Sequence, residues 1–94
     1  MHEMSLINDL MRKIMRVADE HGARRVIGVK VELGALSHLS ADHFREHFEE
    51  AAAGTRADGA RLEVIEKTDL HDPHAQDILL KSVEVDDTAE AGSA

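Results

Sequence analysis

The first two residues of the chain carry nitrogen donors at a spacing that suits a metal ion. The α-amino group of Met1, the deprotonated amide nitrogen of His2 and the His2 imidazole can close adjacent chelate rings around one ion. Near-planar donors that are all nitrogen favour Ni(II) or Cu(II) over tetrahedral zinc. The spacing therefore makes this end of the chain a candidate metal site, and the alternative is a frayed terminus that begins Met-His by chance.

Two further histidines, His71 and His74, flank an Asp72-Pro73 pair in a polar segment. Two imidazoles and a carboxylate within four residues are able to hold a divalent metal ion. The favoured interpretation of the same residues is a polar turn that the proline holds in place.

Another pair, His43 and His47, is spaced four residues apart in a predicted helix, so both side chains share one face. This spacing can bind metal, but Glu46 does not complete a His-Glu-x-x-His pattern with them. A solvated helix face is the favoured interpretation. His21, which ends the first predicted helix, is interpreted as a cation that interacts with the helix dipole.

Composition excludes several classes of function. Eleven basic and nineteen acidic residues give a net charge of −8, and Tyr and Trp are missing, so a nucleic-acid partner is not expected. The lack of cysteine excludes disulfides, a Cys-ligated zinc and a thiol nucleophile. No apolar run approaches ~18 residues and no signal peptide is recognised, so we expect a cytoplasmic protein without a membrane segment. Neither a Gly-rich phosphate loop nor a Gly-x-Ser-x-Gly motif is present, so an enzyme is not expected.

Changes in hydrophobic period divide the chain into five predicted elements. Apolar residues recur every three or four positions from Ile7 to Ala18, which predicts a helix. Ser5 is a candidate N-cap for this helix, with an earlier start as the alternative, and Gly22 ends the helix. The later elements are a strand at 25–33, a helix at 41–53 capped by Ser40, and strands at 62–67 and 78–85.

Alternation along the strands predicts which side chains face the core. In the first strand, Ile27, Val29, Val31 and Leu33 alternate with small or polar residues and are predicted to be buried. In the last strand, the residues predicted to share one face are Leu79, Val83 and Val85, and Leu80 does not fit the alternation.

Three short strands cannot bury both faces of a sheet by themselves. The order α-β-α-β-β therefore predicts an α+β fold, a two-layer sandwich with two helices on one face of a three-stranded mixed sheet. Residues 1–86 are predicted to form this domain. The acidic segment 87–94, which is rich in small residues, is predicted to be a disordered tail.

Four stretches of the chain match one known family. They are Met1-His2-Glu3-Met4-Ser5-Leu6, Val29-Lys30-Val31-Glu32-Leu33-Gly34-Ala35-Leu36-Ser37, Ala51-Ala52-Ala53-Gly54-Thr55 and Gly59-Ala60-Arg61-Leu62-Glu63-Val64. In these stretches, and in its last predicted strand, the chain resembles the nickel-insertion accessory proteins of NiFe hydrogenase maturation, the HypA/HybF family. The resemblance extends over residues 1–67 and 76–86, and the opening hexapeptide together with the Glu-Leu-Gly-Ala-Leu-Ser run is specific.

The resemblance implies a nickel metallochaperone and not an enzyme. The family's nickel site uses the N-terminal amine, the amide and imidazole of the second residue, and the third residue, which here are Met1, His2 and Glu3. The family delivers Ni(II) to the hydrogenase large-subunit precursor together with a GTPase partner, and in some bacteria it also serves urease maturation. We expect the chain to be a monomer or a weak dimer.

The chain departs from the family pattern between its last two strands. The family carries a zinc domain there, built on two Cys-x-x-Cys pairs, whereas this chain has no cysteine and only the loop 68–77. Structural zinc is therefore not expected. Our hypothesis is that His71 or His74 supplies a replacement nickel ligand or forms a separate, weaker metal site.

An alternative function comes from a different class. The chain is then a metal-free adaptor that keeps the fold and a protein-docking surface but has lost metal delivery. The first helix would be that surface, with Met4, Met11 and Met15 available for adaptable packing, although such methionines more often belong to the core.

Overall fold

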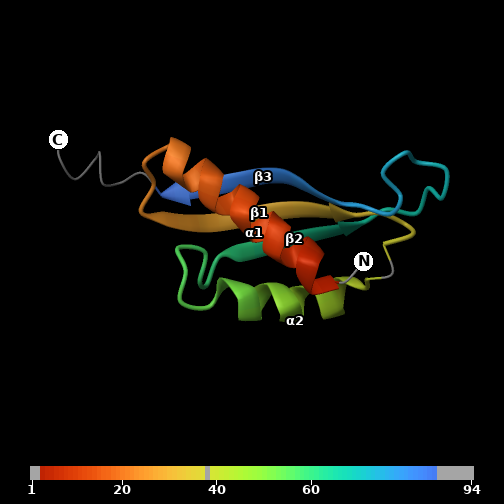
Figure 1. Ribbon diagram of the computed structural model, residues 1–94, viewed down its shortest axis with the longest axis horizontal. Coiled ribbons are helices and arrows are strands. Elements are labelled where there is room, and N and C mark those ends of the chain that lie inside the picture. The colour runs from red at the N-terminus through yellow and green to blue at the C-terminus, as the bar shows by residue number, and fades with distance from the viewer. Residues whose placement is uncertain (1–2, 38, 87–94) are drawn as a thin grey trace.

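Five elements follow one another in the predicted order in the computed structural model, which describes residues 3–37 and 39–86 (Figure 1). They are α1 (Glu3–Glu20), β1 (Arg25–Leu33), α2 (Ala41–Ala52), β2 (Arg61–Glu66) and β3 (Ile78–Asp86). The predicted bounds of α2 and of the three strands agree with these or differ by one residue. The predicted tail at 87–94 lies outside the described residues.

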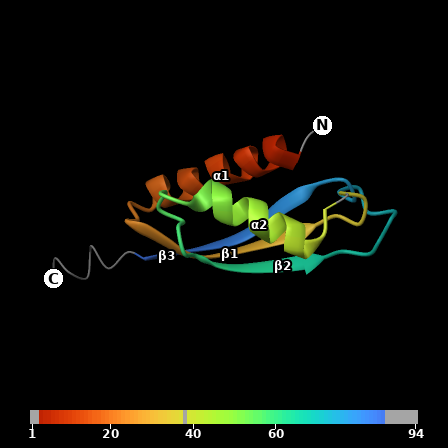
Figure 2. The same cartoon turned by 90° about the horizontal axis from the view of Figure 1, so that it is seen from below.

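The three strands form one mixed sheet in the order β2-β1-β3. The central strand β1 runs parallel to β2 and antiparallel to β3. A parallel pair needs a crossover connection, and α2 supplies it between β1 and β2. Both helices lie on the same face of the sheet (Figure 2), which confirms the predicted two-layer α+β sandwich.

The first helix packs through the apolar stripe that its periodicity predicts. Its buried residues are Ile7, Leu10, Met11, Ile14 and Ala18. Gly22 ends the helix with a φ of 61°, and the Ala23 N–H donates to the Ala18 carbonyl at 2.9 Å, as in a Schellman cap. Because α1 already begins at Glu3, Ser5 lies inside it, and its assignment as the N-cap is wrong.

The second helix is held at its start by Ser40 and along its length by two phenylalanines. The Ser40 hydroxyl oxygen accepts a hydrogen bond from the His43 N–H at 3.1 Å, which confirms the predicted cap. Phe44 and Phe48 are almost completely buried, and their ring centroids are 6.1 Å apart. This packing fixes the rotation of α2 about its own axis, and so it fixes which of its side chains face away from the core.

Replacing Ser40 by alanine tests how far this cap stabilises α2. The Ser40→Ala variant leaves one helix N–H without its side-chain acceptor, which typically costs ~1 kcal/mol of unfolding free energy. For a domain of this size we expect the melting temperature to fall by about 4–8 °C. Thermal unfolding followed by circular dichroism measures the shift, and Ser40→Asp, which restores an acceptor, should recover most of it.

A β-bulge in β1 changes which residues face the core. Val26 pairs with Val85 and Gly28 with Glu84, so Ile27 is the extra residue on this strand. Ile27 is consequently 43% exposed, while Val26 is buried. The prediction that Ile27 faces the core is therefore wrong, whereas Val29, Val31 and Leu33 are buried as predicted.

A second irregularity explains the apolar pattern of β3. Lys30 pairs with Ser82 and Val31 with Leu80, so Lys81 is the additional residue between these pairs. The side chains that pack against the core are Ile78, Leu80, Val83 and Val85. The placement of Leu79 with Val83 and Val85 is therefore wrong, because the bulge shifts the alternation between Leu80 and Val83.

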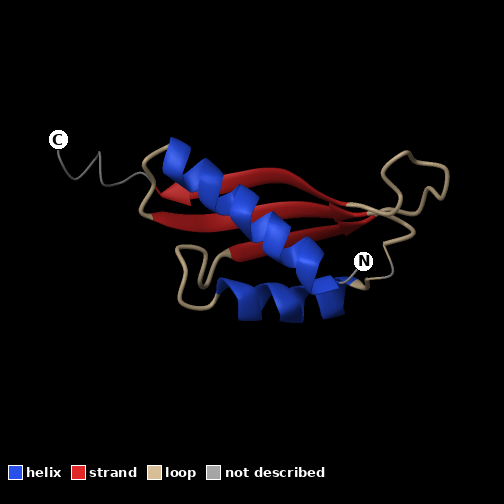
Figure 3. Cartoon of the chain, in the orientation of Figure 1, coloured by secondary structure: helices blue, strands red, loops and turns tan. Residues whose placement is uncertain are grey.

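The loop 68–77 is docked onto the segment that follows β1. The Gly34 N–H donates to the Asp77 carbonyl at 2.9 Å, and the Leu36 N–H donates to the Ala75 carbonyl at 2.6 Å. Ala75 itself is buried. Figure 3 shows this loop in tan at the end of the sheet where β2 finishes and β3 begins. The loop 68–77 is thus attached through the main chain of Gly34 and Leu36.

Neither described helix combines the length and the apolar character that a bilayer crossing requires.

Candidate metal centre

The predicted nickel ligands lie at the edge of what the structure describes. Met1 and His2 fall outside the described residues, and Glu3 is described as the first residue of α1. The chain therefore enters a helix directly after His2. In Figures 1 and 2, the first turn of α1, the first turn of α2 and the loop 68–77 all lie toward the same end of the molecule.

His71 and His74 occupy two consecutive turns of the loop 68–77. The His71 N–H donates to Asp69 Oδ1 at 2.9 Å, and the His74 N–H donates to Asp72 Oδ1 at 2.8 Å. Aspartate side chains that accept from the backbone two residues later form Asx turns, so these carboxylates shape the loop. Both histidines are exposed.

The His74 side chain has a carboxylate partner. Its Nδ1 lies 2.9 Å from Asp77 Oδ2. A carboxylate on one ring nitrogen is the arrangement that orients many metal-binding histidines, because it directs the other nitrogen outward. Among residues 3–37 and 39–86, however, no three His, Cys, Asp or Glu side chains are grouped so that they could hold a metal ion. His71 and His74 are therefore not joined by a third ligand within the part of the chain that is described.

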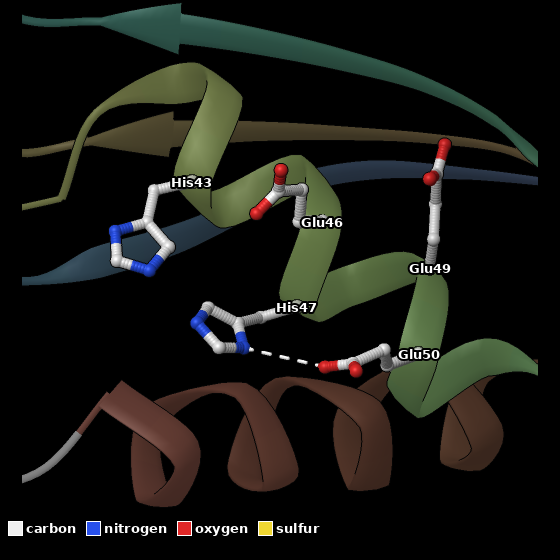
Figure 4. Close-up of a pocket in the computed structure, with 5 residues that line it drawn as sticks. All are labelled: His43, Glu46, His47, Glu49 and Glu50. Atoms are coloured by element: carbon white, nitrogen blue, oxygen red, sulfur yellow. Dashed lines mark ion pairs between the residues drawn. The ribbon is translucent and has the colours of Figure 1, made fainter.

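The histidines of α2 are closer to one another than a simple solvated face requires. The His43 and His47 rings stack with centroids 4.7 Å apart and an interplanar angle of 29°. His47 Nδ1 lies 3.5 Å from Glu50 Oε1, and the His47 side chain is only 27% exposed. Figure 4 shows both rings on the same side of the helix. The prediction of a solvated position holds for His43, which is exposed, but not fully for His47.

These two rings border an open groove of acidic character. The residues that line it are His43, Glu46, His47, Glu49 and Glu50. Three carboxylates beside two imidazoles favour a cation over an anion. Sequence spacing indicated the shared face, but the ring stacking and the partial burial depend on how α2 packs and were not predicted.

The methionines of α1 have different environments. Met11 is buried in the core, Met15 packs partly against it, and Met4 is 41% exposed. The core role that methionines more often have is thus confirmed for Met11. Met11 and Met15 also line a groove together with Ala51 and Thr55.

Comparisons with known proteins agree with this fold and with the start of the chain. The family model described as hydrogenase/urease nickel incorporation, metallochaperone, HypA matches residues 1–71. The hydrogenase maturation factor HypA of Archaeoglobus fulgidus is 37% identical over 74% of this chain and 64% of its own length. The hydrogenase maturation factor HybF of Salmonella typhimurium is 41% identical over 68% of this chain and 57% of its own length. The chain thus spans about three fifths of the length of these curated relatives.

A solved structure shows the same fold at lower sequence similarity. The solution structure of the Ni metallochaperone HypA from Helicobacter pylori superimposes with a TM-score of 0.72 at 18% identity, over 90% of this chain and 97% of that one. The family match ends at residue 71, inside the loop 68–77, yet β3 on the far side of that loop completes the sheet beside β1. Because the family model covers most of the chain, including Met1-His2-Glu3, the chain belongs to the HypA family of nickel-incorporation metallochaperones.

Proposed function

We propose that this chain is a nickel metallochaperone that binds Ni(II) through Met1, His2 and Glu3 and delivers it for hydrogenase maturation. The observation that carries the proposal is the family match over residues 1–71, because it includes the Met-His-Glu start. The ligands are the Met1 amine, the His2 amide nitrogen and imidazole, and Glu3. A group of nitrogen donors in one plane favours Ni(II) over ions that prefer tetrahedral sites.

Such a site suits delivery better than storage. Its donors come from consecutive residues and surround the ion from one edge only, so an acceptor protein can approach from the open side and exchange ligands. Protons compete with the metal for the imidazole and the amine, so binding releases protons. The chain contributes a cargo site and no chemical transformation, which is consistent with a metallochaperone family.

The partners follow from the family's role. We propose the hydrogenase large-subunit precursor as the recipient of nickel and a GTPase as a partner protein. We propose that this delivery takes place in the cytoplasm. Urease, which the family description also names, is a second recipient class. A monomer or a weak dimer is the expected state of the chain.

We propose further that the chain holds no structural zinc. The two Cys-x-x-Cys pairs that the family uses have no counterpart, because the chain contains no cysteine. The loop 68–77 is held instead by main-chain hydrogen bonds to Gly34 and Leu36. Metal analysis of the purified protein tests this, and a stoichiometric zinc ion that resists dialysis would contradict it.

His71 and His74 are proposed to act as a replacement ligand or as a separate, weaker site. The His74 contact to Asp77 supports this, because it leaves the other ring nitrogen free to face outward. We expect a His71→Ala/His74→Ala double variant to lower the affinity or the stoichiometry of nickel in calorimetric titrations. Asp77→Asn, which keeps the shape of the side chain but removes its charge, serves as a less disruptive variant in the same titration. Unchanged affinity and stoichiometry in the double variant would reject this role.

The metal-free adaptor remains the second candidate, and the groove lined by Met11 and Met15 beside α2 is the observation in its favour. One measurement separates the two functions. A planar nickel–nitrogen complex absorbs weakly in the visible range, so stoichiometric Ni(II) produces this band if the chain is a metallochaperone. An adaptor without a metal site gives no band.

A further inference from the structure

Two imidazoles in the middle of α2 are placed as neighbouring ligands. His43 and His47 are separated by one helical turn, their ring centroids are 4.7 Å apart, and both border the acidic groove of this helix (Figure 4). We propose that they form a second metal site, for a divalent transition-metal ion that prefers imidazole, such as Ni(II) or Zn(II). This site shares no ligand with Met1, His2 or Glu3.

Two imidazoles one helical turn apart are close enough to share an ion once their rings converge. Imidazole nitrogens bind such ions at about 2.0–2.1 Å, so two nitrogens that share an ion lie roughly 3 Å apart. Helix positions four apart have Cβ atoms only about 5–6 Å from one another, which allows two rings to converge. The stacked rings reach this geometry by turning about their side-chain bonds. Turning the exposed His43 ring toward an ion breaks its stacking on His47, a cost that the bound ion must offset.

A carboxylate is in place to orient one of the rings. Glu50 Oε1 lies 3.5 Å from His47 Nδ1, and Figure 4 shows the Glu50 side chain reaching back toward that ring. A carboxylate beside one imidazole nitrogen directs the opposite nitrogen to the metal and increases its basicity. Glu50 is therefore a positioning residue, and Glu46, between the two histidines in sequence, adds negative charge that attracts the cation.

The helix that carries the site is itself rigidly placed. Ser40 caps its first turn, and Phe44 and Phe48, each directly after one of the histidines, are buried against the sheet. Ligands on a well-packed helix lose little additional freedom when they bind, which favours a defined site over an adventitious surface contact.

The test uses the full chain with its α-amino group acetylated, so that the proposed site at Met1 and His2 cannot form. In a His71→Ala/His74→Ala background, which removes the other proposed weak site, calorimetric titration with NiCl₂ should show one bound ion. A His43→Ala/His47→Ala double variant in this background should weaken the binding by about tenfold or more. The His43→Gln single variant changes only the exposed histidine and leaves the half-buried His47 in place. It should also weaken nickel binding. A matched control is His21→Ala, which removes an exposed histidine beyond the end of α1 and should bind like the parent.

A second measurement does not depend on titration heats. An ion that links two positions one turn apart binds only the folded helix, so added nickel should raise the melting temperature of the acetylated parent. The double variant should lose this rise while keeping its metal-free melting temperature near that of the parent. Equal nickel affinity and equal thermal shift in the double variant and the His21→Ala control would overturn the proposal. Failure of the first site shows itself separately, as unchanged nickel binding by His2→Ala in the unblocked chain.

Discussion

Acetylating the Met1 amine, or placing a tag before it, is expected to abolish tight nickel binding. In the proposed site, the amine, the His2 amide and the His2 imidazole form two chelate rings that share the amide nitrogen, so removing one end opens a ring and weakens the other. We expect the affinity to fall by more than the ~10–100-fold that loss of a supporting partner costs at metal sites. Calorimetry near neutral pH, with the visible nickel–nitrogen band as a second readout, measures this loss.

His2→Ala should reproduce the effect without any change to the amine. It keeps the chelating amine and amide but removes the imidazole that closes the second ring. His21→Ala is the matched control, because it removes an exposed imidazole at the other end of α1. The weak binding that remains after acetylation of a chain that also carries His71→Ala and His74→Ala is assigned to His43 and His47, and it should disappear when both are replaced. A tagged protein that binds nickel as tightly as the untagged chain would refute the N-terminal site.

The five elements were predictable because their signals are local. The stripe of α1, the Ser40 cap and the left-handed Gly22 each depend on residues within a few positions of one another. The errors in the strands have a non-local cause. Ile27 turns outward and Leu80 turns inward because bulges shift the pairing between β1 and β3, which lie about fifty residues apart in sequence. Alternation within one strand carries no information about such a shift.

The candidate sites likewise divide into one that local sequence reveals and others that depend on the folded arrangement. The spacing of Met1 and His2 is a purely local feature, which is why it could be proposed from the sequence. The stacking of His43 on His47 needs the rotation of α2 that Phe44 and Phe48 impose by burial against the sheet. The attachment of the loop 68–77 to Gly34 needs both the end of β1 and the start of β3. Only the folded arrangement brings these parts together.

Gly34→Ala is expected to be among the most destabilising single changes in the chain. A Cβ at this position would lie 2.5 Å from the His74 carbonyl oxygen and still closer to the carbonyl of Ala75. These are main-chain atoms of the docked loop, so they can move away only if the loop moves. Overpacking costs about 1–3 kcal/mol, and each of the two hydrogen bonds that hold the loop adds about 1 kcal/mol when it is lost. The sum predicts a loss of about 3 kcal/mol or more, which lowers the melting temperature by more than about 10 °C.

Gly28→Ala is the matched control, because the same methyl group meets a different kind of neighbour. Its Cβ would lie 2.6 Å from Glu84 Oε1 and 2.9 Å from Arg61 Nη2. Arg61 and Glu84 form an ion pair that spans Gly28 from the two outer strands, and both side chains are more than half exposed. Exposed pairs of this kind contribute ~0–1 kcal/mol, so the side chains can shift at little cost.

Hydrogen exchange separates loop release from general destabilisation. In Gly34→Ala the amides of residues 34 and 36, which donate to the loop, should lose protection before those in the middle of β1. In Gly28→Ala they should stay protected. If the two variants unfold at the same temperature and protect these amides equally, then the loop 68–77 is not held by its contact with Gly34. The loop 68–77 would in that case be joined to the fold only through β2 and β3.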